Sequence, residues 1–190
     1  MELSNLNIKN GLCISLGANI DSNYGKPFES LIICKPKLEN LIKNWINQSK
    51  SFDKGKEIEA SKIIFYWSSI YETSPHGINQ EQPNYLNTLL LIKTNSFPDQ
   101  TTKNAKFLLK KLKNLERNFG RKKNPPKMKW LSRCLDLDIL WWEDFCFKDE
   151  ELTLPHPRFM NRNFVISPLS EVLSRTQIVK KIKDPKWIID

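Results

Sequence analysis

Two carboxylates lie two residues apart inside an apolar stretch, residues 133–142 (RCLDLDILWW). Its apolar residues and closing aromatic pair predict a buried β-strand, on which Asp136 and Asp138 project from one face, roughly 7 Å apart. Two like charges at this spacing raise each other's pKa unless a cation lies between them. Mg²⁺ suits such a pair because it takes one or two carboxylates and fills its other positions with water and substrate phosphates.

Basic residues precede this strand and suggest what else the site binds. Carboxylates for a metal ion, together with cations for phosphates, are the groups that phosphoryl transfer from a nucleotide requires. A simpler alternative stays open, because most Asp-x-Asp pairs are solvated, cap a turn or form ion pairs, here with Arg133. The basic cluster consists of Arg121, Lys122, Lys123, Lys127, Lys129 and Arg133.

The composition is that of an ordinary globular protein, and its 190 residues favour a single domain, residues 1–190. A net charge of +9 predicts an anionic partner, although a lysine-rich surface would give the same value. Residues 1–10 hold no long apolar run and no apolar window reaches about 18 residues, so we expect neither a signal peptide nor a membrane span. Four cysteines without C-x-x-C spacing predict reduced thiols and a cytoplasmic location.

Hydrophobic periodicity indicates which elements would hold this strand. Apolar and β-branched runs predict three further strands, at residues 11–17, 61–71 and 85–94. Apolar residues at helical spacing predict three helices: residues 37–48, a second from an N-cap at Ser96 to Gly120, and a third within residues 159–173.

The resulting order, β-α-β-β-α-β, is that of the split-βαβ, ferredoxin-like arrangement. We therefore expect an α+β fold whose antiparallel sheet has helices packed on one face, with an additional C-terminal helix. The other face of the sheet would be free for ligands. Surface insertions are expected at residues 21–36 and 49–60, and peripheral tails at residues 1–10 and 175–190.

Six short motifs occur in an order that is similar to a known enzyme family. They are SLGAN (15–19), YETSP (71–75), QPNYLN (82–87), Gly120-Arg121, W-x-x-R-x-LDLD (130–138) and LTLPHPR (152–158). Each is weak alone, but together they span the chain from about Leu12 to Leu173. The set resembles the 6-hydroxymethyl-7,8-dihydropterin pyrophosphokinase (HPPK) family of folate biosynthesis.

The resemblance implies an ATP-dependent diphosphotransferase. The terminal diphosphate of ATP would move to the hydroxymethyl group of the pterin, leaving AMP, and Asp136 and Asp138 would bind two Mg²⁺ ions. The groups expected around the phosphates, as catalytic residues, are Arg121, Arg133, His156 and Arg162. The implied partners are ATP and 6-hydroxymethyl-7,8-dihydropterin, with no nucleic acid and no membrane, and the chain is expected to be a monomer.

The resemblance also implies two substrate sites. For the pterin, Tyr85 and Phe164 would stack on the ring faces and Asn87 would bind the ring edge. The neighbouring pterin contacts would be Thr73, Ser74 and Pro75. The nucleotide contacts would be Glu116, Lys123, Trp130, Ile139, Thr153 and His156. Two simpler alternatives stay open, a core position for Phe164 and a surface charge on a helix for Glu116.

The chain departs from the family pattern before the Asp-x-Asp strand. Leu131-Ser132 stands where Gly-Pro is usual, and Lys123 replaces a second arginine, which keeps the charge but loses the bidentate fork. These departures concern loop closure and turnover rate.

Two other functions fit the sequence less well. An RNA-recognition motif shares the element order, but its aromatic signature is absent and two aspartates would repel a phosphate backbone. A regulator that has lost catalysis is disfavoured because Asp136, Asp138 and Arg133 are intact.

Overall fold

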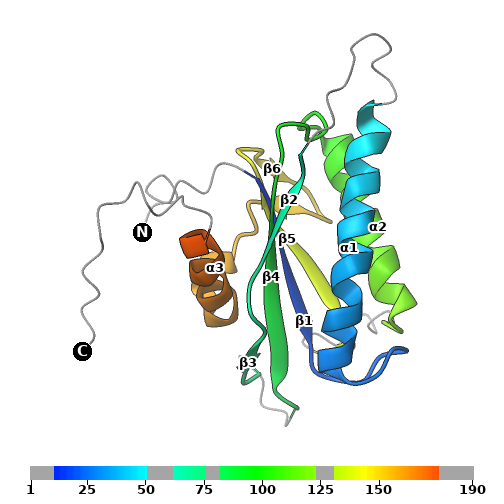
Figure 1. Cartoon of the computed structure of the whole chain (residues 1–190), viewed down its shortest axis with the longest axis vertical. Coiled ribbons are helices and arrows are strands. Elements are labelled where there is room, and N and C mark those ends of the chain that lie inside the picture. Colours follow the sequence, from blue (N-terminus) through cyan, green and yellow to red (C-terminus); the bar gives the residue numbers. More distant parts are fainter. Residues whose placement is uncertain (1–10, 51–61, 76–81, 123–130, 176–190) are drawn as a thin grey trace, which may run out of the picture.

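The computed structural model of the protein describes residues 11–50, 62–75, 82–122 and 131–175 (Figure 1). Its strands are β1 (Leu12–Ala18), β2 (Ile64–Trp67), β3 (Tyr71–Thr73), β4 (Tyr85–Lys93), β5 (Asp136–Trp142), β6 (Phe147–Lys148) and β7 (Thr153–Leu154). Its helices are α1 (Pro27–Lys50), α2 (Thr102–Asn118), a 3-10 turn at Phe159–Asn161 and α3 (Asn163–Arg175).

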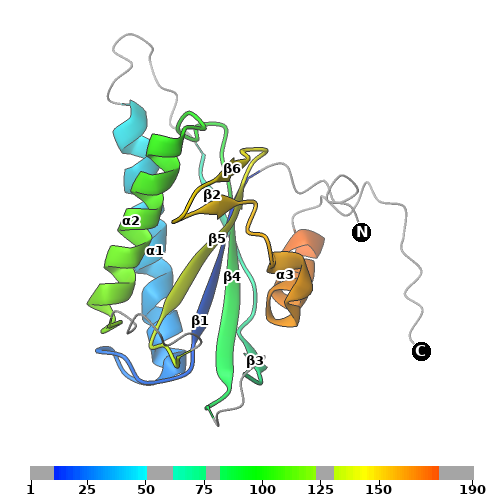
Figure 2. The same cartoon turned by 180° about the vertical axis from the view of Figure 1, so that it is seen from behind.

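The main sheet is antiparallel, with strand order β2-β4-β1-β5, and β3 also pairs with β4. Strands β2 and β3 together take the place of the single predicted strand at 61–71. This order places β1 and β4 in the centre and β5 at an edge, beside α2 (Figure 2). The prediction of an α+β, ferredoxin-like core is confirmed.

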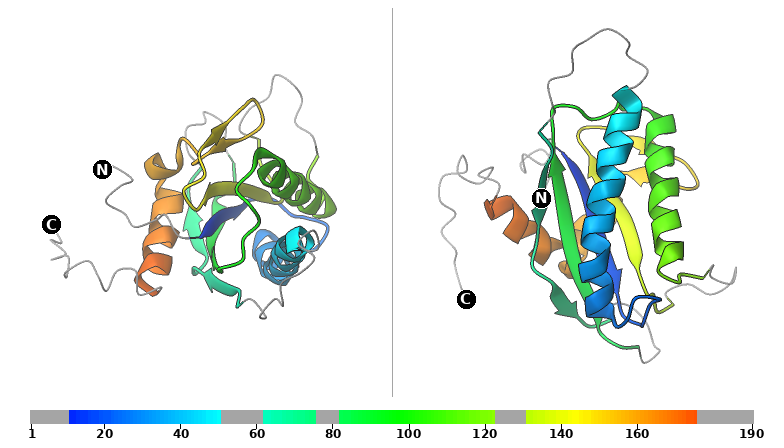
Figure 3. Two further views of the ribbon diagram at one scale, coloured as in Figure 1. Left: turned by 90° about the horizontal axis from the view of Figure 1, so that it is seen from above. Right: turned by 45° about the vertical axis from the view of Figure 1, so that its right-hand side comes forward.

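The helices cover the two faces of the sheet unequally. Helices α1 and α2 pack on one face, where they enclose the larger core with Leu12, Ile14 and Leu137. Helix α3 packs on the other face, over Leu89, Leu91 and neighbouring core residues (Figure 3). The face that was expected to be free is therefore partly covered by α3.

A single carboxylate ties α3 to the edge formed by β2 and β3. Glu171 accepts hydrogen bonds from the backbone N–H and the hydroxyl of Ser69, at 2.8 and 2.9 Å, and from the Tyr71 hydroxyl at 3.0 Å. Burial would raise the pKa of Glu171, but these hydrogen bonds outweigh it and lower the pKa. These hydrogen bonds position helix α3, whose first turn carries Phe164.

Helix α1 begins ten residues earlier than the sequence predicted, so the insertion expected at 21–36 is wrong for residues 27–36. Pro36 suggested a break, because proline inside a helix costs about 3 kcal/mol. Pro36 is exposed, however, while Leu31 and Cys34 are fully buried in register with Leu38. Burial of this apolar face outweighs the proline. The insertion predicted at 49–60 falls largely on residues outside the described ranges.

Helix α2 also differs from its prediction at the start. Its N-cap is Thr101, whose hydroxyl accepts from the Asn104 backbone N–H at 3.2 Å, and not Ser96. The strand predicted at 61–71 is interrupted because the Ser68 hydroxyl accepts the Leu89 N–H at 2.9 Å, which replaces a ladder bond between main chains. The break divides β2 from β3.

Candidate active site

The two aspartates lie at the start of β5 on the face that α1 and α2 do not cover. Their side chains are 19% and 32% exposed, for Asp136 and Asp138 respectively. Leu135, Leu137 and Ile139 are buried in the core on the opposite side of the strand. Strand alternation thus produces the arrangement that the sequence predicted, a polar pair on one face and an apolar face toward the core.

Asp136 is held between two arginines. One carboxylate oxygen contacts Arg121 Nη1 and the other contacts Arg133 Nη1. Burial would raise the pKa of Asp136, but the charges of Arg133 and Arg121 outweigh it and lower the pKa. The ion pair with Arg133, which the sequence left open as an alternative to metal binding, is therefore present.

Asp138 lies in a different electrostatic setting. It forms a long ion pair, 3.7 Å from Oδ2 to Arg162 Nη1. Burial, and next the charge of Asp136, raise the pKa of Asp138, so its negative charge is under-compensated. A divalent cation would relieve this, and Mg²⁺ needs only one or two protein carboxylates when phosphates complete its shell. Within the described ranges no group of three or more Asp, Glu, His or Cys side chains is arranged to hold a metal ion, so the two carboxylates fit Mg²⁺ together with substrate phosphates and water.

Glu116, for which the sequence left a surface position open, is buried with 1% exposure. Its Oε1 accepts the backbone N–H of Leu137 at 2.7 Å, between the two aspartates. The same oxygen lies 2.9 Å from Lys113 Nζ and 2.7 Å from Arg121 Nη1. Burial raises the pKa of Glu116 even though these cations oppose the shift. Glu116 therefore positions β5 and Arg121, and the surface interpretation is wrong.

His156 is oriented by two main-chain contacts. Its backbone N–H donates to Leu140 O at 2.7 Å, and its Nδ1 accepts from the Arg158 N–H at 3.2 Å. Because Nδ1 is an acceptor, the proton of the neutral ring lies on Nε2. Burial lowers the pKa of His156, which keeps the ring neutral near pH 7. The ring thus presents one N–H donor, and the charges of Asp138 and Arg162 act on it.

Asn87 and Thr73 lie together on neighbouring strands. The Asn87 side chain is buried and donates from Nδ2 to Thr73 Oγ1 at 2.8 Å. Tyr85, two residues before Asn87 on β4, lies on the same face, and its hydroxyl donates to Leu131 O at 3.4 Å. Burial raises the pKa of Tyr85, so the phenol stays protonated and able to donate. An amide beside an aromatic ring is what binding of a flat heterocycle requires.

The remaining predicted substrate contacts differ in how exposed they are. Phe164 is half-buried, with Arg162 5.4 Å above its ring, so it is both a core neighbour and an accessible ring. Ser74 is exposed, Pro75 and Thr153 are half-buried, and Lys123 and Trp130 lie outside the described residues.

Ile139 stays a predicted nucleotide contact, although its side chain is 3% exposed in the core beneath the helices. The Ile139 side chain therefore cannot contact a nucleotide on the aspartate face. Its backbone N–H, two residues after that of Leu137, points outward from edge strand β5, since alternate residues of an edge strand face away from the sheet. Any nucleotide contact at this position would come from the main chain.

Asn19 is a residue whose role the sequence did not reveal. It is 2% exposed, and its Oδ1 accepts the Arg133 N–H at 2.7 Å. Its Nδ2 donates to Pro83 O at 3.2 Å and to Ser132 Oγ at 3.3 Å. Asn19 thus joins the end of β1 to the segments before β4 and β5. Its place in the SLGAN motif was a signal, but its partners are 64 and 114 residues away.

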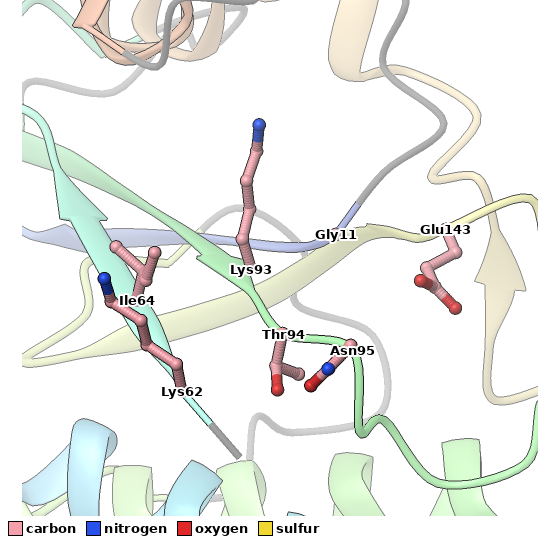
Figure 4. Close-up of a pocket in the computed structure, with 7 residues that line it drawn as sticks. All are labelled: Gly11, Lys62, Ile64, Lys93, Thr94, Asn95 and Glu143. Carbon is pink, nitrogen blue, oxygen red and sulfur yellow. The ribbon is translucent and has the colours of Figure 1, made fainter.

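A separate hollow of about 410 Å³ lies at the opposite end of the sheet (Figure 4). Gly11, Lys62, Lys93 and Glu143 are among its lining residues, and the two ammonium groups lie apart in the view. Gly11 is about 20 Å along the strand from Gly17, which pairs with Asp136. The hollow contains none of the predicted site residues, and its distance from Asp136 separates it from the aspartate site.

A family model described as 7,8-dihydro-6-hydroxymethylpterin-pyrophosphokinase (HPPK) matches residues 13–174 of the chain. The chain belongs to this family. The resemblance drawn from the six motifs is thus confirmed, and membership in the HPPK family supports pyrophosphokinase activity in folate biosynthesis.

Individual relatives agree with the family match. A protein of Haemophilus influenzae named 2-amino-4-hydroxy-6-hydroxymethyldihydropteridine pyrophosphokinase is 36% identical over 130 residues, which is 64% of this chain and 74% of the relative. A protein of the same name from Aquifex aeolicus is 35% identical, over 65% of this chain and 68% of the relative. The folate synthesis bifunctional protein, mitochondrial, of Pisum sativum is 34% identical over 56% of this chain, which covers only 18% of that longer protein.

Proposed function

We propose that this HPPK-family chain transfers the β,γ-diphosphate of ATP to the hydroxymethyl oxygen of 6-hydroxymethyl-7,8-dihydropterin, with two Mg²⁺ ions held by Asp136 and Asp138. The observation that carries the proposal is the pair of carboxylates on the open face of β5, with Arg121, Arg133 and Arg162 beside them. When bound, the ions would neutralise charge on the α- and β-phosphates.

The two aspartates have different roles in this proposal. Both oxygens of Asp136 face arginines, whereas the ion pair of Asp138 is long, so Asp138 is better able to accept a further hydrogen bond. Asp138 therefore orients the hydroxymethyl group and receives its proton. The oxygen then forms a bond to the β-phosphorus, the bond from the β-phosphorus to the bridging oxygen breaks, and AMP leaves with that oxygen.

Cationic and neutral donors surround the phosphates. Arg121 and Arg133 are partners of Asp136, and their forks can turn to phosphate oxygens as charge develops there. His156 donates from Nε2 without carrying a charge, and Arg162 lies on the Asp138 side. Lys123 and Trp130 remain predicted nucleotide contacts.

The pterin is recognised by its edge and its faces. Asn87, supported by Thr73, offers an amide to the ring edge, while Tyr85 and Phe164 supply the stacking surfaces. Backbone groups near Ser74 and Pro75 complete the pocket. We propose further that the chain acts as a monomer in the cytoplasm. The free cysteines of the described residues support a reducing compartment. No helix among the described residues has the length and apolarity to cross a membrane.

The test pairs two aspartate-to-asparagine variants of the full chain. Mass spectrometry should detect AMP and the pterin diphosphate when wild-type protein, ATP, Mg²⁺ and hydroxymethyldihydropterin are combined. Asp138→Asn should reduce product formation at least about 100-fold, because it removes both a metal ligand and the proton acceptor. Asp144→Asn, at an exposed position beyond the far end of β5, should leave it unchanged.

Stability separates a catalytic loss from a folding defect. Since the pKa of Asp138 is raised, a neutral side chain suits the fold, and Asp138→Asn should melt at the wild-type temperature or above. Fluorescence titration of the wild type with pterin, Mg²⁺ and a non-hydrolysable ATP analogue tests binding without turnover. Absence of both pterin binding and AMP formation would refute the proposed enzyme; binding without AMP formation would indicate an inactive regulator.

A further inference from the structure

One row of residues crosses the open face of the sheet from the proposed pterin site to the metal site. Tyr71 of β3 pairs with Asn87 of β4, Asn87 pairs with Gly17 of β1, and Gly17 pairs with Asp136 of β5. Directly paired residues of antiparallel strands project from the same face. Adjacent strands are about 4.8 Å apart, so Asn87 and Asp136 are separated by about 10 Å with Gly17 between them.

Gly17 is not required by its backbone conformation. The described glycines with positive φ are Gly11, Gly25 and Gly120, whereas Gly17 lies within β1 and pairs on both sides. In such a position glycine is less favourable than alanine, because it adds backbone entropy to the unfolded chain and contributes no packing. Backbone conformation therefore gives no reason for glycine here, and a close approach by a neighbouring side chain or by a ligand is the usual alternative.

The side chain of Asn87 closely approaches the Cα atom of Gly17. A Cβ atom at Gly17 would lie 3.0 Å from Asn87 Oδ1 and 3.9 Å from Tyr85 Cδ1. The Asn87 amide nitrogen is engaged by Thr73, so its oxygen faces the Gly17 side. A methyl group would thus enter the gap between the amide and the carboxylates, and it would contact two residues assigned to the pterin.

We propose that Gly17 is a specificity-determining residue, whose missing side chain leaves the path by which the hydroxymethyl arm passes from the ring edge at Asn87 to Asp138. This inference rests on the proposed function. The path suits a flat bicyclic heterocycle with a short hydroxylated arm. Ser15, the next residue on this face of β1, pairs with Asp138 and Leu89. Its side chain is also small, so the surface beneath the proposed path stays low as far as Asp138.

The experiment compares Gly17→Ala with the wild type, using two ligands. In fluorescence titrations with Mg²⁺ and a non-hydrolysable ATP analogue, Gly17→Ala should weaken binding of 6-hydroxymethylpterin about tenfold or more, as one methyl group in a packed site does. Pterin without the arm should lose no more than about threefold in affinity, because the methyl group affects it only through small shifts of Asn87 and Tyr85 and does not meet it in the path. The melting temperature should change little, because the better strand preference of alanine and the 3.0 Å contact of its Cβ with Asn87 Oδ1 oppose each other.

The results separate this inference from the proposed function. If the wild type binds pterin and forms AMP but Gly17→Ala binds the arm-bearing ligand equally well, the proposed role of Gly17 is wrong and the proposed enzymatic function is unaffected. Equal losses for both ligands would also overturn it, because the methyl group would then act through Asn87. A wild type that neither binds pterin nor forms AMP refutes the proposed function itself.

Discussion

Replacement of Glu116 by alanine and by glutamine would test how the aspartate strand is held. Three contacts of Glu116 converge on one oxygen, Oε1, which accepts from Leu137 N–H, Lys113 and Arg121. Alanine removes that oxygen and leaves the Leu137 N–H without its acceptor. Glutamine keeps an oxygen of the same reach and removes only the charge. The two variants therefore separate the hydrogen bond from the negative charge.

The expected effects on stability differ in size. Loss of the acceptor for a buried N–H costs about 1–3 kcal/mol, and loss of side-chain packing adds to it, so we expect about 3 kcal/mol for Glu116→Ala. In a chain of this length that lowers the melting temperature by about 6–12 °C. Burial raises the pKa of Glu116, which means that the fold does not favour the charged form. Glu116→Gln should therefore stay within about 1 kcal/mol of the wild type.

Thermal and urea unfolding, followed by circular dichroism, would measure these differences, with Glu150→Ala at an exposed turn as the control. The control should change stability by no more than about 0.5 kcal/mol. Diphosphate transfer should fall about 10- to 100-fold in Glu116→Ala, because small displacements of reacting groups cost that much. Equal destabilisation by alanine and glutamine would show that the charge, and not the bond to Leu137, holds the strand, and our reasoning would be wrong.

Two further predictions concern titration and thiol reactivity. Because the folded-state pKa of Asp138 is raised, the native state binds more protons than the unfolded state above the ordinary pKa. The protonated Asp138 side chain thus contributes its full stability in acid, and this contribution is lost as the pH rises through the folded-state pKa. Urea unfolding without Mg²⁺, measured at several values from about pH 4 to pH 7.5, should therefore show Asp138→Asn gaining stability relative to the wild type as the pH rises. An unchanged difference across this range would contradict the assignment. The second prediction concerns the cysteines. Cys146 is exposed, whereas Cys13, Cys34 and Cys134 are buried. Burial raises the pKa of Cys34 to about 12. A thiol reagent should modify Cys146 rapidly in the native protein and the other three only after denaturation; Cys146→Ser should abolish the rapid phase, and its persistence would refute the prediction.

Short-range patterns in the sequence were sufficient for the strand that carries the chemistry. Alternation alone placed Asp136 and Asp138 on one face and Leu137 on the other, because the period of a strand is two whatever surrounds it. The order of elements, and with it the ferredoxin-like core, followed from apolar periodicity in the same way. Where local periodicity and burial agree, residue pattern is enough to define the element.

Local signals failed where distant contacts outweighed them. Pro36 indicated a break, but burial of Leu31 and Cys34 continues helix α1 through it. Glu116 had the sequence of a surface helix position, and only the approach of β5 buries it against Leu137.

Residue types and their spacing predicted the carboxylate pair, and the motifs shared with the HPPK family implied the arginines, the histidine and the aromatic rings. How these side chains meet depends on the folded chain, as in Asn19, which links segments 64 and 114 residues away, and in Gly17, which separates Asn87 from Asp136. The physical reason is that strand pairing and burial are set by residues far apart in the chain, and no local period records which strands become neighbours.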